Sequence, residues 1–137
     1  MKQTFTVVKK EAVEPIMGQV TVGGFFVTLL HSATIAHLMH LQTSSYAEHK
    51  ALNEYYDGIV DLVDDLIESY QGKRDVIVDY PAMFAYPDVD ALVYLKGISD
   101  YVIENRGIVG DDSELQNQID AIQDLINSTV YKLRRLA

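Results

Sequence analysis

The sequence predicts an all-α protein that folds as an up-down four-helix bundle, on the basis of three observations. Apolar residues recur at helical spacings along three long segments, as in helices with one buried face, and a fourth segment is apolar nearly all round. Glycine, proline and serine separate these segments, as is typical of connections between helices. The chain has 137 residues and is 48% hydrophobic, which is enough for one core of ordinary size. We therefore expect a single domain over residues 1–137.

The first half of the sequence predicts a helical hairpin. After an N-terminal extension, residues 1–15, we expect a first helix over residues 17–42 that is apolar on nearly all sides and therefore buried. Thr43–Ser45 is a short polar break, and either of its serines is a suitable N-cap for the next helix. That helix extends over residues 46–71, with Gly72 as its C-terminal stop. Because the connection is short, the two helices should be antiparallel.

The second half predicts two more helices after a long connection. Residues 73–86 form the connection between helices two and three, and their apolar content suggests that they pack on another surface, such as a partner subunit. Pro87 suits the first position of the third helix, which extends over residues 87–106. The sequence Ser113–Gln116 matches a capping box, and the fourth helix continues from it to the C-terminus.

Composition and charge exclude several classes of function. The net charge of −9 argues against a surface built to neutralise phosphates, so we expect no direct nucleic-acid binding. The chain has no cysteine, which excludes disulfides and thiol chemistry. The most apolar stretch, Val20–Leu41, contains three histidines and has no basic flank, so we interpret it as a buried helix and not as a membrane span. Together with the absence of a recognisable secretion signal, this leads us to expect a cytoplasmic protein.

Histidines and carboxylates on the first two helices are the candidate metal ligands. His37 and His40 lie on one face near the end of the first helix, and His49 lies near the start of the second. Farther along the second helix, Asp64 and Glu68 lie on one flank beside its apolar stripe. Imidazole with carboxylate is a ligand combination that suits iron, manganese or zinc.

Helix geometry restricts how these residues could form one site. At about 1.5 Å per residue, Asp64 lies roughly 22 Å from His49 along the same helix, and Glu68 roughly 28 Å from it. One metal ion cannot be bound from both positions of a single helix, but two antiparallel copies about a two-fold axis would bring them together. A shared site would thus require at least a dimer. In the hairpin, His40 should stand level with His49 and His37 one turn deeper, while His31 lies too deep to be a good candidate.

Two other interpretations of the same residues are open. The histidines could be hydrogen-bonded core residues and the acids a solvated surface, in which case the protein would have a structural or interaction role through residues 73–86. Alternatively, the bundle could carry a zinc or manganese site in place of an iron site.

The segment His40–His49, with Asp64 and Glu68 beyond it, resembles the core of the Dps-like miniferritins of the ferritin-like superfamily. The C-terminal Val130–Arg135 is similar to the end of the last helix in that family, and the chain also resembles a small set of phage-encoded proteins. The resemblance covers helices one and two well and helix four weakly.

The resemblance to miniferritins implies a ferritin-like bundle, a twelve-subunit shell and ferroxidase activity. Ferrous iron would be oxidised by oxygen or peroxide at two-fold interfaces, and the shell would store the ferric product. His40 or His37, together with His49, would supply imidazoles from one subunit, and Asp64 and Glu68 would supply carboxylates from its mate. Because the chain has no basic tail, the resemblance does not extend to DNA binding.

Overall fold

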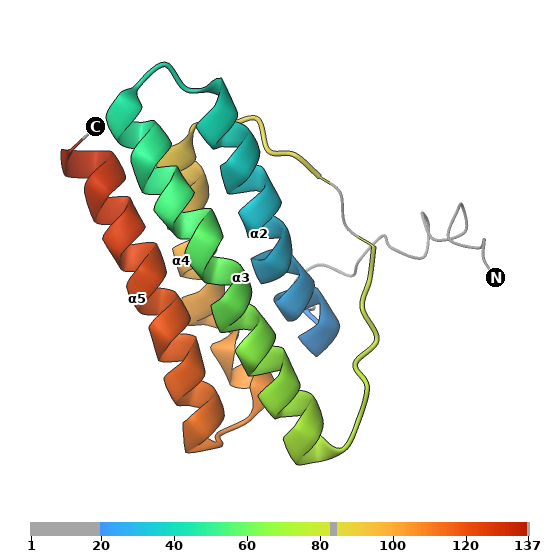
Figure 1. The fold of residues 1–137 in the computed structure, drawn as a ribbon. Coiled ribbons are helices and arrows are strands. Elements are labelled where there is room, and N and C mark those ends of the chain that lie inside the picture. Colours follow the sequence, from blue (N-terminus) through green and yellow to red (C-terminus); the bar gives the residue numbers. More distant parts are fainter. Residues whose placement is uncertain (1–19, 83–84, 137) are drawn as a thin grey trace.

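The computed structural model describes residues 20–82 and 85–136, and all the regular secondary structure in these ranges is helical. The expected N-terminal extension, residues 1–15, lies outside the described residues. Four long helices pack as a bundle (Figure 1), which confirms the all-α prediction. They are α2 (Val22–Gln42), α3 (Tyr46–Arg74), α4 (Ala91–Asn105) and α5 (Ser113–Arg135), and the short 3-10 helix η1 (Arg106–Val109) follows α4.

The four helices form a closed ring of neighbours. Helix α3 packs on α2 and α5, and α4 packs on α5 and α2, so that α3 and α4 lie across the diagonal of the bundle. The core between them contains large side chains with no solvent exposure, including Phe25, Phe26 and Tyr55. Within it, Tyr55 donates a 2.7 Å hydrogen bond to Ser32, whose own hydroxyl donates to the Leu29 carbonyl. The buried polar groups are therefore satisfied by one another.

The connection between α3 and α4 determines the direction of the second hairpin. It extends over residues 75–90 and returns along the length of the bundle (Figure 1), so that α4 begins at the same end as α3. At the opposite end, Arg74 at the close of α3 donates a 2.6 Å hydrogen bond to the Val109 carbonyl just beyond α4. Helices α3 and α4 are thus parallel. The expected up-down order holds within each hairpin but not across this connection, which is long enough in extended form to span α3.

Side chains on α2 and α3 hold the connection against the bundle. Gln71 accepts hydrogen bonds from the Val78 amide, at 3.0 Å, and from the Tyr80 hydroxyl, at 2.6 Å. The His31 ring donates through Nε2 to the Ala85 carbonyl at 3.0 Å. Gly23 is required on the facing side of α2, because a Cβ atom there would lie 2.0 Å from the Asp79 carbonyl oxygen. These contacts show that the connection packs on its own chain.

Three helices begin at side-chain caps. Thr21 accepts from Gly24 N at 2.9 Å, Ser45 from Glu48 N at 3.1 Å, and Asp90 from Val93 N at 2.9 Å. Ser45 is one of the two serines expected to cap the second helix. The first helix begins at Val22 and not near residue 17 as expected, because residues 20 and 21 are not helical and Thr21 is the N-cap.

Three further predicted helix ends are wrong. Helix α3 continues through Gly72 to Arg74 and stops at Asp75, which adopts the left-handed conformation with φ 54°. Pro87 is not helical, because the Asp90 cap starts α4 at Ala91. The N-cap position of α5 is Asp112 and not Ser113, and its carboxylate binds Arg74 without capping the helix.

Helix α2 differs from its neighbours because it contains no Asp, Glu, Lys or Arg. By length and composition alone it could cross a membrane, but half of its most apolar window is buried inside the bundle, and the core helix of a soluble protein passes the same test. The burial is less complete than the sequence predicts, since Leu38 and Leu41 on its outer side are exposed. An uncharged helix with an open apolar side therefore borders the site described next.

Candidate metal site

Three histidines and one tyrosine form a ring cluster beside the turn between α2 and α3. We call His37, His40, His49 and Tyr56 the histidine cluster. The His40 and His49 rings stack with their centroids 3.6 Å apart at 20°, and the His37 and Tyr56 rings stack at 4.1 Å and 15°. The His40 ring joins the two pairs, since its centroid lies 5.8 Å from that of His37 and 5.2 Å from that of Tyr56. This confirms the prediction that His40 and His49 lie opposite each other across the turn.

Reciprocal hydrogen bonds to the backbone fix the two stacked histidines. His40 Nδ1 lies 2.7 Å from the His49 carbonyl oxygen, and His49 Nδ1 lies 2.9 Å from the His40 carbonyl oxygen. Because a carbonyl oxygen only accepts, both Nδ1 atoms must carry the proton. Each neutral ring therefore keeps its lone pair on Nε2, which is the arrangement found where a histidine binds a metal and its other nitrogen is held by a carbonyl.

The three histidines differ in their access to solvent. His40 is only 6% exposed, His49 is half-buried, and His37 is exposed although its ring stacks on Tyr56 of α3. His37 and His40 are three residues apart and lie on nearly the same face of α2, so their different exposure comes from how the rings pack and not from helix spacing. An incoming ion would meet His37 or His49 first.

A short polar chain extends the cluster along α3. The Tyr56 hydroxyl donates a 3.2 Å hydrogen bond to Asn53 Oδ1, and Asn53 Nδ2 donates at 2.8 Å to Asp57 Oδ2. The stacking of Tyr56 on His37 was not among the predictions made from the sequence. The signal was available, because positions 49, 53 and 56 recur at spacings of four and three and share one flank of the helix.

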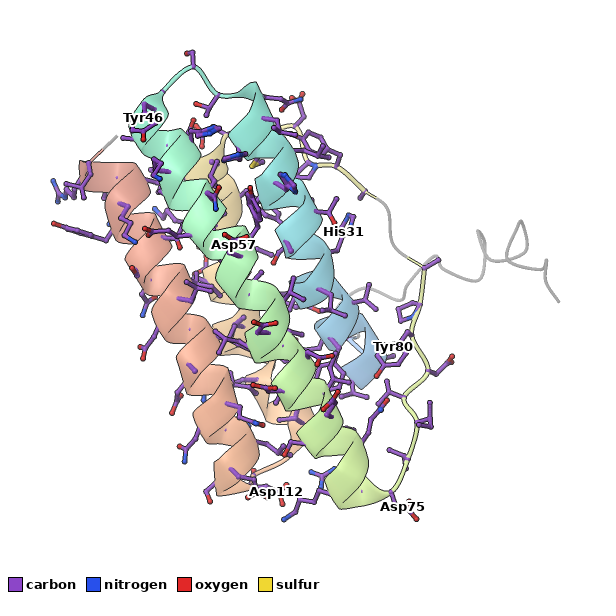
Figure 2. All side chains as sticks on the ribbon, in the orientation of Figure 1. His31, Tyr46, Asp57, Asp75, Tyr80 and Asp112 are labelled. Carbon is purple, nitrogen blue, oxygen red and sulfur yellow. The ribbon has the colours of Figure 1, made fainter. Side chains whose placement is uncertain are left out.

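The two predicted carboxylate ligands lie apart from the histidine cluster. Asp64 and Glu68 are exposed on α3, farther toward the end marked by Asp75 and Asp112 in Figure 2. Among the described residues no group of three or more His, Cys, Asp and Glu side chains is placed to hold a metal ion. A single chain thus brings His37, His40 and His49 together and leaves Asp64 and Glu68 elsewhere, so the site expected from the sequence requires a second copy.

The comparisons with known proteins give one match. The model of DUF5856, a family of unknown function, matches residues 40–133. This range contains His40, His49, Asp64 and Glu68 and extends from the last turn of α2 into the last turn of α5. Neither a curated protein nor a solved structure matches the chain.

Proposed function

The chain belongs to DUF5856, a family of unknown function, and we propose that it is a ferritin-like protein that oxidises ferrous iron at a site shared between two copies. The observation that carries this proposal is the histidine cluster, in which the backbone holds the Nδ1 atoms of His40 and His49 and leaves both Nε2 lone pairs for a ligand. Iron is the substrate, and each ferrous ion would give one electron to oxygen or peroxide.

The course of the chain supports the ferritin-like part of the proposal. Ferritin-like bundles differ from simple up-down bundles by a single long crossover connection between two helical hairpins. Here the hairpins α2–α3 and α4–α5 are joined by such a connection, residues 75–90, which makes α3 and α4 parallel.

A two-fold arrangement of α3 would complete the site. Consider two copies of α3 that lie antiparallel about a two-fold axis near residue 57. Because residue 57 is about midway between position 49 and positions 64–68, position 49 of one copy would lie beside positions 64–68 of the other. Asp57 marks this part of α3 in Figure 2. The neighbouring α2 has no charged side chain and exposes Leu38 and Leu41, so an apolar surface adjoins the contact.

In this arrangement each residue has a separate role. His49 and either His40 or His37 would bind ferrous iron through imidazole nitrogen, and Asp64 and Glu68 of the other copy would bind it through carboxylate oxygen. The carboxylates add negative charge beside the ion and so favour the ferric product over the ferrous substrate. A closed shell, with twelve copies as in the miniferritins, would retain that product.

A structural role is the second candidate, and the same hydrogen bonds favour it. His40 and His49 already satisfy each other's backbone carbonyls and stack, with His40 nearly buried, and this is sufficient to close the hairpin without any ion. The exposed Val76 and Ile77 on the connection would then be the interaction surface. A zinc or manganese site at the same residues would be a third variant, in which metal binds and no oxidation follows.

Iron oxidation separates these candidates. Ferrous iron is added to the protein without oxygen, air or peroxide is admitted, and ferric absorbance is followed with time. We expect oxidation faster than in buffer, a fall to the buffer rate in Glu68→Gln, and the wild-type rate in the matched control Asp65→Asn, which alters an exposed acid off the predicted flank. A wild-type rate equal to that of buffer would favour the structural role, and an unchanged rate in Glu68→Gln would remove our ligand assignment.

A mixing experiment tests whether the site is shared. Copies carrying His49→Ala and copies carrying Glu68→Gln should each be inactive alone. A mixed dimer would contain one site with both residues intact, so mixing and reassembly should restore part of the activity. Activity that stays absent after exchange, with mixed dimers demonstrated by mass spectrometry, would contradict a site built from two copies.

A further inference from the structure

A small pocket lies between α4 and α5, on the side of the bundle opposite the α2–α3 hairpin. It has a volume of about 190 Å³, which is smaller than the pockets that hold drug-sized ligands. Its lining is polar apart from one valine, and consists of Lys96, Ser99, Asp100, Asn127, Val130 and Arg134. None of these residues belongs to the proposed iron site.

The two cations of this pocket have no carboxylate partner. Lys73, Arg74, Arg106 and Lys132 each form an ion pair with an aspartate or glutamate. Among the described residues, Lys50, Lys96, Arg134 and Arg135 form none, and of these four Lys96 and Arg134 line the same pocket. Two positive charges are thus left facing one pocket.

A half-buried glutamine orients the two neutral polar residues of the lining. Gln123 Nε2 donates to Ser99 Oγ at 2.9 Å and to Asn127 Oδ1 at 3.0 Å. Because each oxygen is already used as an acceptor of this amide, the Ser99 hydroxyl hydrogen and the Asn127 amide hydrogens are the groups left for a ligand. The pocket therefore offers four kinds of donor, two of them charged, and one carboxylate acceptor, Asp100.

We propose that this pocket binds a phosphate group that still carries a proton, either as inorganic phosphate or on a small phosphorylated molecule. Arg134 matches two phosphate oxygens with its planar fork, and Lys96 adds a point charge. Ser99 and Asn127 donate to the remaining oxygens. Asp100, which can only accept while ionised, would take the hydrogen bond of the P–OH group and would repel an anion that has no proton, such as sulfate.

Calorimetric titration with inorganic phosphate at about pH 6 and constant ionic strength tests the site, with metal removed by chelation so that the result is independent of iron. We expect saturable binding of one phosphate per chain, weakened at least about tenfold in Arg134→Gln and, independently, in Lys96→Gln. The matched control Arg135→Gln, which makes the same charge change on the next residue, should remain within about twofold of wild type. Absence of saturable binding, or equal weakening by Arg134→Gln and Arg135→Gln, would overturn the proposal.

Selectivity tests the role of Asp100 and the source of the phosphate. Sulfate should bind at least about tenfold more weakly than phosphate, and Asp100→Asn should reduce that difference, because the amide no longer repels an unprotonated anion. Equal affinity for the two anions in the wild-type protein would overturn the protonated-phosphate assignment. Glycerol 3-phosphate is the probe for a phosphorylated molecule, and tighter binding of this probe than of inorganic phosphate would assign the pocket to that source.

Discussion

The two ends of the bundle are closed by different kinds of contact. At the turn end, marked by Tyr46 in Figure 2, stacked neutral rings and hydrogen bonds to backbone carbonyls join α2 to α3. At the opposite end, marked by Asp112, ion pairs join α3 to the start of α5. There Arg74 binds Asp112 at 2.7 Å, and Lys73 binds both Asp112, at 3.2 Å, and Glu114, at 2.9 Å.

The comparison shows why nitrogen ligands are available at only one end. Lys73 and Arg74 are cations with no lone pair to offer, and their donors are already used by carboxylates. The stacked histidines use one nitrogen each for the fold and keep the other. The two ends should also respond differently to salt, because ion pairs near the surface are screened while ring stacking and hydrogen bonds to the backbone are much less affected.

The largest expected effect is at the ionic end, in Gly110→Ala. Gly110 has φ 99° and ψ 179°, a conformation open almost only to glycine, and an added Cβ would lie 2.4 Å from Arg74 Nη2. We expect a loss of about 2–3 kcal/mol in the free energy of unfolding, measured by urea titration. Gly107→Ala, in the 3-10 helix that ends just before Gly110, is the control, since no atom lies within 4 Å of its added Cβ. Equal effects of the two changes would contradict this account.

At the histidine end, His40→Ala should have a somewhat smaller effect. The change removes a ring that is 6% exposed together with its hydrogen bond to the His49 carbonyl, so we expect a loss of about 2 kcal/mol. His37→Ala, which removes an exposed ring, should lose less than about 1 kcal/mol. Urea titration of both variants gives the comparison, and a larger loss for His37→Ala would show that the stacked pair is not the main closure of the hairpin.

Salt should weaken the effect of a change at the ionic end. Asp112→Asn keeps the backbone carbonyl that accepts from Gln116 N but removes the charge that binds Lys73 and Arg74. Its melting temperature should fall below that of wild type at low salt, and the difference should shrink by about half or more in 1 M sodium chloride. The difference between His40→Ala and wild type should be nearly independent of salt. A salt-independent difference for Asp112→Asn would show that lost packing, not charge, is the cause.

The smallest expected effect is the pH dependence of the same ion pairs. Hydrogen bonds from Arg74 and then Lys73 hold the pKa of the Asp112 carboxyl below its usual value. The folded protein therefore binds fewer protons there than the unfolded chain, and the contribution is complete above about pH 4 and is lost as the pH falls through the lowered pKa. Asp112→Asn should flatten the fall in the urea midpoint between about pH 5 and pH 3. Asp111→Asn, an exposed neighbour, should keep the wild-type slope.

Helix existence was predictable from the sequence, whereas several helix ends were not. Three apolar stripes of helical period correspond to α3, α4 and α5, and the segment that is apolar nearly all round corresponds to α2. Gly72 was a reasonable stop, but the contacts of Arg74 with Val109 and Asp112 favour two more helical residues, and these contacts join positions 35 and 38 residues apart in the chain. The ion pair with Arg74 also holds the Asp112 carboxylate, which therefore does not cap α5. No local pattern contains such information.

The candidate site shows the same division between local and distant information. Counting residues from the short turn places His40 opposite His49, and the rings stack there. The reciprocal bonds between their Nδ1 atoms and backbone carbonyls depend on how closely α2 approaches α3, which spacing does not specify. Whether Asp64 and Glu68 meet a histidine depends on the surface of a second molecule, so that assignment stays a prediction.

The absence of charged residues in α2 has a consequence for synthesis of the chain. This helix leaves the ribosome first among the four, and at about 5–20 residues per second the 29 residues of α3 need several more seconds to follow. During that time a segment apolar enough to enter a lipid bilayer would have no partner in its own chain. Because the turn after α2 has only three residues, the next segment to emerge is α3, which is a helix that covers α2. A longer insertion at this turn should therefore increase chaperone capture or aggregation of nascent chains more than it lowers the stability of the finished fold.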